Sequence, residues 1–166
     1  MLNLVGIAVA LVAQAAAPPA CAPGMVVHYD ELHWYSVQSP PGWCFCPDGV
    51  FRPRKPLPVP DQPEIRVSQF YVAELGQFES SVQRDLKRVA SGGTVTQRPS
   101  LQTRKGLSVL VWSVYQPTTG HCSLVAYLLQ EQVCVVRIMA VGRSAAGLEA
   151  AAVAFDKLVA SYAANI

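Results

Sequence analysis

The sequence predicts an α+β fold, with an antiparallel β-sheet of about six strands flanked by two main helices. Three observations predict it. Apolar residues recur at helical spacing over residues 78–90. Three apolar runs between residues 107 and 141 follow one another through short turns, which is typical of an antiparallel meander. A second helical pattern follows, from a capping Ser144 to about Ala163.

The N-terminal segment is typical of a secretory signal peptide. Leu2 to Val12 is an apolar run, and Ala13-Gln14-Ala15 after it fits the small-residue cleavage pattern. The run is shorter than the roughly 20 residues that a membrane-spanning helix needs. We therefore expect residues 1–15 to be a signal peptide, with a buried N-terminal helix as the alternative. Residues 16–32 are then a Pro-rich leader and residues 33–166 a single domain, secreted or periplasmic, with no transmembrane span in the mature form.

The first half of the domain alternates short strands with turns. We expect strands at residues 33–37, 43–46, 50–51 and 65–72, because branched and aromatic residues there are bounded by Pro, Gly and Asp. The segment 52–63 contains five prolines and is expected to be an extended surface loop.

The second half is expected to hold the helix at 78–90 and the meander. Ser91-Gly92-Gly93 ends the helix, with glycine supplying the left-handed backbone. The meander strands are expected at 107–115, 122–129 and 133–141. Both alternating sets of their residues are apolar, so we expect the central strands to be covered on both faces.

Five cysteines in an exported chain predict disulfides. The candidates are Cys44, Cys46, Cys122 and Cys134. Because the count is odd, one cysteine stays outside these bridges, and Cys21, in the leader, is the natural candidate. A lipid anchor at Cys21 is disfavoured, because prolines occupy two of the three positions before it.

A tight turn at 130–131 would place Cys134 opposite about Tyr127, with Cys122 about five residues further along the strand. That separation exceeds the limit of about 7 Å between bonded α-carbons. Cys122 and Cys134 should therefore not pair with each other. Each is expected to reach Cys44 or Cys46, or only one bridge forms.

Charge argues against a nucleic-acid partner. The formal net charge is +2 and only 14% of residues are charged, against roughly 25% in a typical soluble domain. The tightest basic cluster, Arg52, Arg54 and Lys55, lies among prolines and is expected to be a solvated loop. A basic stripe of the kind that binds a phosphate backbone is missing.

No motif predicts a catalytic, cofactor or metal site. Cys44 and Cys46 could form a redox pair or two metal thiolates, but we expect structural disulfides instead. The segment His28-x-Asp30-Glu31-x-His33 does not converge three ligands and is expected to be solvated. His121 has no evident acid partner for nucleophilic catalysis. The sequence therefore does not favour the interpretation that this protein is an enzyme.

Arg137 is the most unusual polar residue of the predicted sheet, because it is a charged residue inside the apolar run 133–141. A buried arginine must be paired or must reach the surface along its stem. We expect Arg137 to bond a nearby carboxylate or backbone carbonyls. Anchoring of an acidic ligand is the alternative, which makes Arg137 the single candidate binding residue.

The order of elements over residues 33–162 resembles the PsbP-like superfamily (PsbP/Mog-type), as an exported bacterial member. The resemblance depends on Pro40-Pro41-Gly42-Trp43, on the segment Phe155–Ser161 and on element order. It implies an α/β/α sandwich used as a binding or assembly module, and it transfers no functional residue.

These observations together predict an exported, non-catalytic binding or assembly module of the cell envelope, without a cofactor. Its partner is expected to be an unknown protein or small ligand. The alternative is a thiol-active or metal-binding periplasmic protein that uses Cys44 and Cys46.

Overall fold

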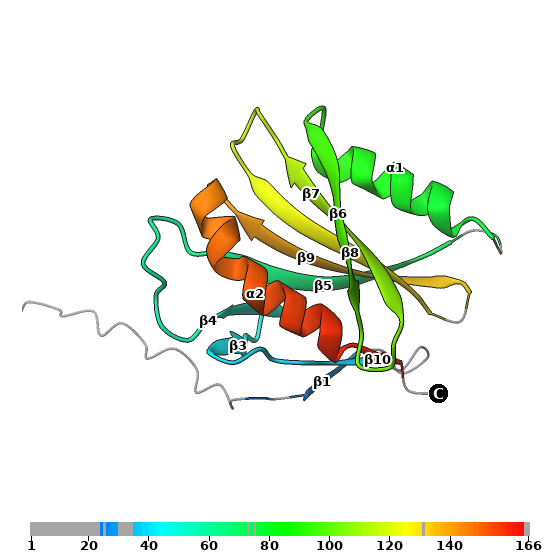
Figure 1. Ribbon diagram of the computed structural model, residues 1–166, viewed down its shortest axis with the longest axis horizontal. Helices are drawn as coiled ribbons and strands as arrows, with labels where there is room; N and C mark the ends of the chain where they lie inside the picture. The colour runs from blue at the N-terminus through cyan, green and yellow to red at the C-terminus, as the bar shows by residue number, and fades with distance from the viewer. Residues whose placement is uncertain are drawn as a thin grey trace, which may run out of the picture.

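The structure is a computed structural model that describes residues 24, 26–29, 35–72, 74, 76–130 and 132–164. The described part of the chain is α+β with antiparallel strands, as predicted (Figure 1). The predicted strand count is wrong, because the described residues form ten strands in two sheets rather than one sheet of about six. The expected signal peptide and Cys21 lie outside the described residues. None of the described helices is long and apolar enough to cross a membrane.

The larger sheet has seven strands in the order β3-β4-β5-β9-β8-β7-β6, and every neighbouring pair is antiparallel. The strands are β3 (Trp43–Phe45), β4 (Val50–Pro53), β5 (Glu64–Tyr71), β6 (Thr94–Gln102), β7 (Ser108–Tyr115), β8 (Cys122–Gln130) and β9 (Cys134–Gly142). The predicted meander is β7-β8-β9. β5 pairs with β9 on its other side, and β6, which the sequence did not predict, forms the edge beside β7.

The smaller sheet has three strands in the order β1-β2-β10. They are β1 (Val26–Tyr29), β2 (Tyr35–Gln38) and β10 (Ala163–Ala164). β1 and β10 were not predicted. β1 falls within the segment 16–32 that was expected to be leader, and β10 begins where the second helix was expected to end.

Helix α1 (Phe78–Ala90) has the predicted bounds, and it buries Val82, Leu86 and Ala90 as the helical spacing implies. Its end differs in detail from the expectation. Ser91 takes the first left-handed position, with φ of 45°, and Gly92 follows it with φ of 82°.

Helix α2 (Ala145–Ser161) begins at the predicted cap, where the Oγ of Ser144 accepts a hydrogen bond from the Gly147 N–H at 3.1 Å. This bond satisfies one of the amide groups that a helix start leaves without a partner. The helix ends earlier than the expected Ala163, and β10 follows it.

The two helices pack on opposite faces of the larger sheet. On β8, Leu124, Ala126 and Leu128 join the core cluster that contains α2, whereas Val125 and Tyr127 join the cluster that contains α1. This division follows the period-two alternation of a strand. Both faces of the central strands are therefore apolar where a helix covers them.

Coverage of the α1 face is incomplete, contrary to the expectation for the central strands. α1 contacts β6 and β7 and lies toward that side of the sheet (Figure 1). The part of the same face over the start of β5 and the end of β9 has no helix on it. Side chains there line a cavity instead of a core.

Candidate functional site

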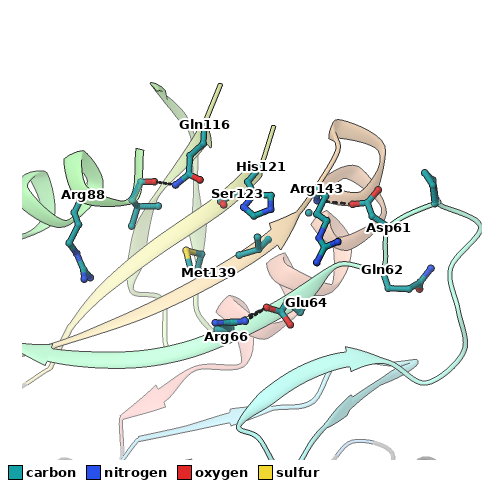
Figure 2. Close-up of a pocket in the computed structure, with 14 residues that line it drawn as sticks. Asp61, Gln62, Glu64, Arg66, Arg88, Gln116, His121, Ser123, Met139 and Arg143 are labelled. Atoms are coloured by element: carbon teal, nitrogen blue, oxygen red, sulfur yellow. Dashed lines mark hydrogen bonds and ion pairs between the residues drawn. The ribbon is translucent and has the colours of Figure 1, made fainter. Parts of the chain in front are cut away.

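A cavity of about 860 Å³ lies on the part of the α1 face that the helix leaves uncovered. β5, β8 and β9 form its floor, α1 forms one side, and the loops before β5, before β8 and after β9 form the rim (Figure 2). On the floor, β8 contributes Ser123 and β9 contributes Met139 and Val141. The cavity is thus a direct consequence of a helix that covers only part of its sheet.

The sequence of β5 places polar groups in this cavity. Glu64 and Arg66 lie on the cavity face, whereas Ile65 between them is fully buried on the α2 face. Further along the same face, Phe70 packs edge-on against Tyr127 beneath α1, with ring centroids 6.3 Å apart. The cavity face of β5 therefore changes from polar to apolar where α1 begins to cover it.

Two of the three arginines that line the cavity are paired. Arg66 donates from Nε to the Oε1 of Glu64 at 2.7 Å, and the Nη2 of Arg88 lies 2.6 Å from the Oδ1 of Asp85. Glu64 also accepts from Arg52 at 3.3 Å. The charges of Arg66 and Arg88 are therefore at least partly compensated inside the protein.

The third arginine, Arg143, has a guanidinium group that makes no hydrogen bond or ion pair with any described residue; only its backbone N–H is engaged. The imidazole of His121 is likewise without a partner among the described residues. Both side chains line the cavity from its rim (Figure 2). Two potential donors therefore face the cavity uncompensated.

Asp61 fixes this part of the rim. Its carboxylate accepts from the Arg143 N–H at 2.7 Å and from the Ser144 hydroxyl at 2.6 Å. The bond from Ser144 is the main cause that lowers the pKa of Asp61 below its ordinary value. A Cβ atom on Gly147 would lie 2.5 Å from the Asp61 Oδ2. The Pro-rich loop that carries Asp61 can therefore approach α2 this closely only because residue 147 is a glycine. The Pro-rich loop is thereby attached to the start of α2.

Gln116 connects the opposite rim to α1. Its side-chain amide donates to the carbonyl of Val89, and its Oε1 accepts from the hydroxyl of Thr119 at 3.0 Å. The backbone N–H of Gln116 also donates to the carbonyl of His121 at 2.9 Å. These bonds hold the turn that carries His121 against the helix.

Ser123 and His121 both line the cavity, where a nucleophile and a base would have to meet. Within the described ranges, no hydrogen bond joins Ser123 to His121, so the two do not form a nucleophile–base pair of the kind that covalent catalysis requires. The described part of the chain also contains no group of three or more His, Cys, Asp and Glu side chains placed to hold a metal ion.

Arg137, the candidate binding residue, lies outside the cavity lining and makes the carboxylate bond that was expected. Its Nη1 lies 3.1 and 2.9 Å from the two carboxylate oxygens of Asp85, and its Nε donates to Ser68 at 3.1 Å. The hydroxyl of Tyr127 donates to the same carboxylate at 2.8 Å. Arg137 thus anchors α1 to the sheet.

Burial opposes ionisation of Asp85, but hydrogen bonds from Arg88, Tyr127 and Arg137 outweigh it and hold the pKa of Asp85 below its ordinary value. Burial, followed by the bond to Asp85, raises the pKa of Tyr127. The carboxylate is therefore ionised and the phenol neutral at pH 7. This cluster is an internal ion pair of the fold.

No disulfide links any two of the four described cysteines, although the Sγ of Cys46 lies 3.9 Å from the carbonyl oxygen of Cys44. Cys122 lies opposite Gly142, whereas Cys134 lies opposite Gln130, at the other end of the β8–β9 pair. The predicted partner position, Tyr127, is wrong by three residues, because β8 continues to Gln130 and the turn lies further along the chain than assumed. The conclusion that Cys122 and Cys134 are too far apart to bond holds. β3 ends at Phe45, so Cys46 lies beyond the strand that was expected to include it.

Sequence reasoning missed the residues that define the cavity, above all Arg143 and Asp61. Of the histidines considered, only His121 lines the cavity; His28 lies in β1 opposite Ser36, and His33 lies outside the described residues. The one available signal was the polar alternation at the start of β5, which is typical of an uncovered sheet face. Comparison by sequence assigns no family, because the chain matches no protein-family model and no curated protein.

Proposed function

We propose that this chain is an exported, non-catalytic binding protein of the cell envelope that holds a small ligand in the cavity beside α1. The observation that carries the proposal is the cavity itself, which presents uncompensated donors at its rim over a floor of Ser123, Met139 and Val141. Its volume of about 860 Å³ falls within the range of about 300–1,000 Å³ that ligand pockets occupy.

Export and the PsbP-like α/β/α sandwich stay part of the proposal. The apolar N-terminal run and its small-residue cleavage pattern support export. A helix on each face of an antiparallel sheet supports the sandwich. Because the same fold serves many functions, the argument for binding comes from the cavity and not from the fold.

A cavity-filling variant tests the proposal. Ser123 is 6% exposed at the cavity floor, so Ser123→Phe occupies the space that a ligand would take. Thermal unfolding would be followed for the full chain with a panel of amino acids, monosaccharides, fatty-acid carboxylates, their neutral amides and phosphate monoesters. We expect at least one class to raise the Tm of the wild type and to leave that of Ser123→Phe unchanged.

The matched control is Ser108→Phe, which adds the same group at an exposed position on β7. It should respond to ligand as the wild type does. If no class stabilises the wild type, or if Ser123→Phe responds as strongly as the control, the cavity is not a binding site and the proposal is wrong.

Thiol chemistry at Cys44 and Cys46 is the alternative. Cys44 is disulfide-bonded, so Cys46 is the one of the two that offers a free thiol, and the guanidinium of Arg52 lies beside its side chain. Counting the reactive thiols of the native protein addresses both this alternative and the predicted disulfides. Alkylation of Cys46 no faster than that of Cys122 would remove the alternative.

A further inference from the structure

The arrangement of Arg143 and His121 gives the cavity a definite chemical preference. In the β8–β9 ladder, Cys122 lies opposite Gly142 and Ser123 opposite Val141. His121 immediately precedes β8 and Arg143 immediately follows β9, so the two residues lie side by side at the same end of this strand pair. Both side chains line the cavity. Figure 2 shows the two side chains on the same part of the rim.

The acidic groups of the cavity are already engaged elsewhere. The carboxylate of Asp61 accepts from the backbone N–H of Arg143 and from Ser144, at the start of α2. The carboxylate of Glu64 accepts from Arg66 and Arg52. Neither carboxylate forms an ion pair with the Arg143 guanidinium. Its positive charge is therefore available to a ligand, beside the imidazole of His121.

We infer that the cavity binds a small organic anion, with its carboxylate or phosphate group held between Arg143 and His121. This inference rests on the proposed binding function and specifies its ligand class. A guanidinium presents a planar pair of N–H donors that matches two oxygens of a carboxylate or a phosphate. The imidazole of His121 and the hydroxyl of Ser123 add donors beside it.

The cavity extends beyond the anionic end, so the ligand also has an uncharged body. Met139 and Val141 form the floor between Arg143 and α1, and Val89 lines the helix side. A volume of about 860 Å³ is far larger than one carboxylate or phosphate group needs. The ligand is therefore an anion with an apolar body of several carbons, rather than an inorganic ion.

Three probes of equal chain length separate charge from shape. Hexanoate carries a carboxylate, hexyl phosphate carries a phosphate, and hexanamide is the neutral analogue of hexanoate. Calorimetric titration of the full chain should show binding of at least one anion and a much weaker response to hexanamide. The stronger of the two anions identifies which group the site prefers.

Arg143→Gln tests the residue that the inference depends on. Its side chain contacts no described residue by a hydrogen bond or ion pair, so the Tm without ligand should stay unchanged. We expect the anion affinity to fall at least about tenfold, because a charge-assisted hydrogen bond is lost. The control is Arg54→Gln, at an exposed arginine in the Pro-rich loop, which should bind as the wild type does.

Several outcomes would overturn the inference. Binding of hexanamide as tight as that of the anions would show that charge does not matter, and the proposed binding function would survive. Equal anion affinity of Arg143→Gln and wild type, or of Ser123→Phe and wild type, would place the anion elsewhere. Failure of both anions to bind would also contradict it, whatever the wider ligand panel shows.

Discussion

At the residue scale, one carboxylate connects α1 to the sheet. Asp85 is 8% exposed and meets two arginines in different surroundings, since the Arg137 side chain is 16% exposed and that of Arg88 is 73% exposed. An exposed ion pair contributes about 0–1 kcal/mol, because water screens it. Removing one partner of a buried pair costs more, since the other charge is left buried without compensation.

The substitution Asp85→Asn should therefore lower the free energy of unfolding by about 3 kcal/mol at pH 7. The measurement is urea denaturation of both proteins. Arg88→Gln is the matched control, because it removes the exposed partner of the same carboxylate and should cost at most about 1 kcal/mol. Equal losses in the two variants would show that Arg137 does not depend on Asp85.

The same pair of proteins gives a pH readout. The folded-state pKa of Asp85 is held below its ordinary value, so its stabilising effect is fully present above the unfolded pKa of about 3.9 and is lost as the pH falls through the folded pKa. The stability difference between the wild type and Asp85→Asn should shrink below about pH 4. A difference that grows toward low pH would contradict the assignment.

At the element scale, the sequence predicted the elements that bury a periodic face. α1 repeats Val82 and Leu86 toward the sheet, and the strands of the meander carry long apolar runs. β6 gives no such signal, because every residue of it except Leu101 is exposed and Pro99 interrupts it. An edge strand of this kind is fixed by pairing with β7, and pairing leaves no pattern in the strand's own sequence.

The cavity could not be predicted for a related reason. The polar Glu64 and Arg66 indicate an uncovered part of a sheet face, but not which part. That depends on where α1 packs, which is a tertiary property. Arg143 and Asp61 are adjacent in space only because their loops meet at the start of α2, although 82 positions separate them in the sequence.

Two neighbouring glycines, Gly92 and Gly93, lie in the connection between α1 and β6 and should respond differently to substitution. A Cβ atom on Gly93 would lie 1.8 Å from the carbonyl oxygen of Tyr115, in the backbone of β7. Gly93→Ala should force the helix end away from the sheet and cost about 3 kcal/mol. Gly92→Ala meets no atom within 4 Å and should cost only about 1–2 kcal/mol for the left-handed backbone. Thermal unfolding of the two variants compares them, and a larger loss for Gly92→Ala would refute the close approach.

At the scale of the whole molecule, α2 joins the two sheets into one core. A single cluster includes Val37 of β2, Phe155 of α2 and Leu124 of β8. Tyr162 makes the same connection with polar and aromatic contacts, because its hydroxyl donates to Gln130 of β8 at 3.0 Å and its ring lies 5.8 Å from that of Tyr35 of β2. The smaller sheet therefore has no core of its own and should not unfold independently.

Phe155→Ala tests this shared core. The side chain is fully buried, so its loss should lower the free energy of unfolding by about 3–5 kcal/mol. Because both sheets depend on the same cluster, the protection of amides from hydrogen exchange should fall equally in β2 and β8. Val153→Ala is the control on the same helix, since Val153 is 65% exposed and its truncation should change stability by less than about 0.5 kcal/mol. If Phe155→Ala lowers the protection of β2 and leaves that of β8 unchanged, the two sheets are separate cooperative units and α2 does not unite them.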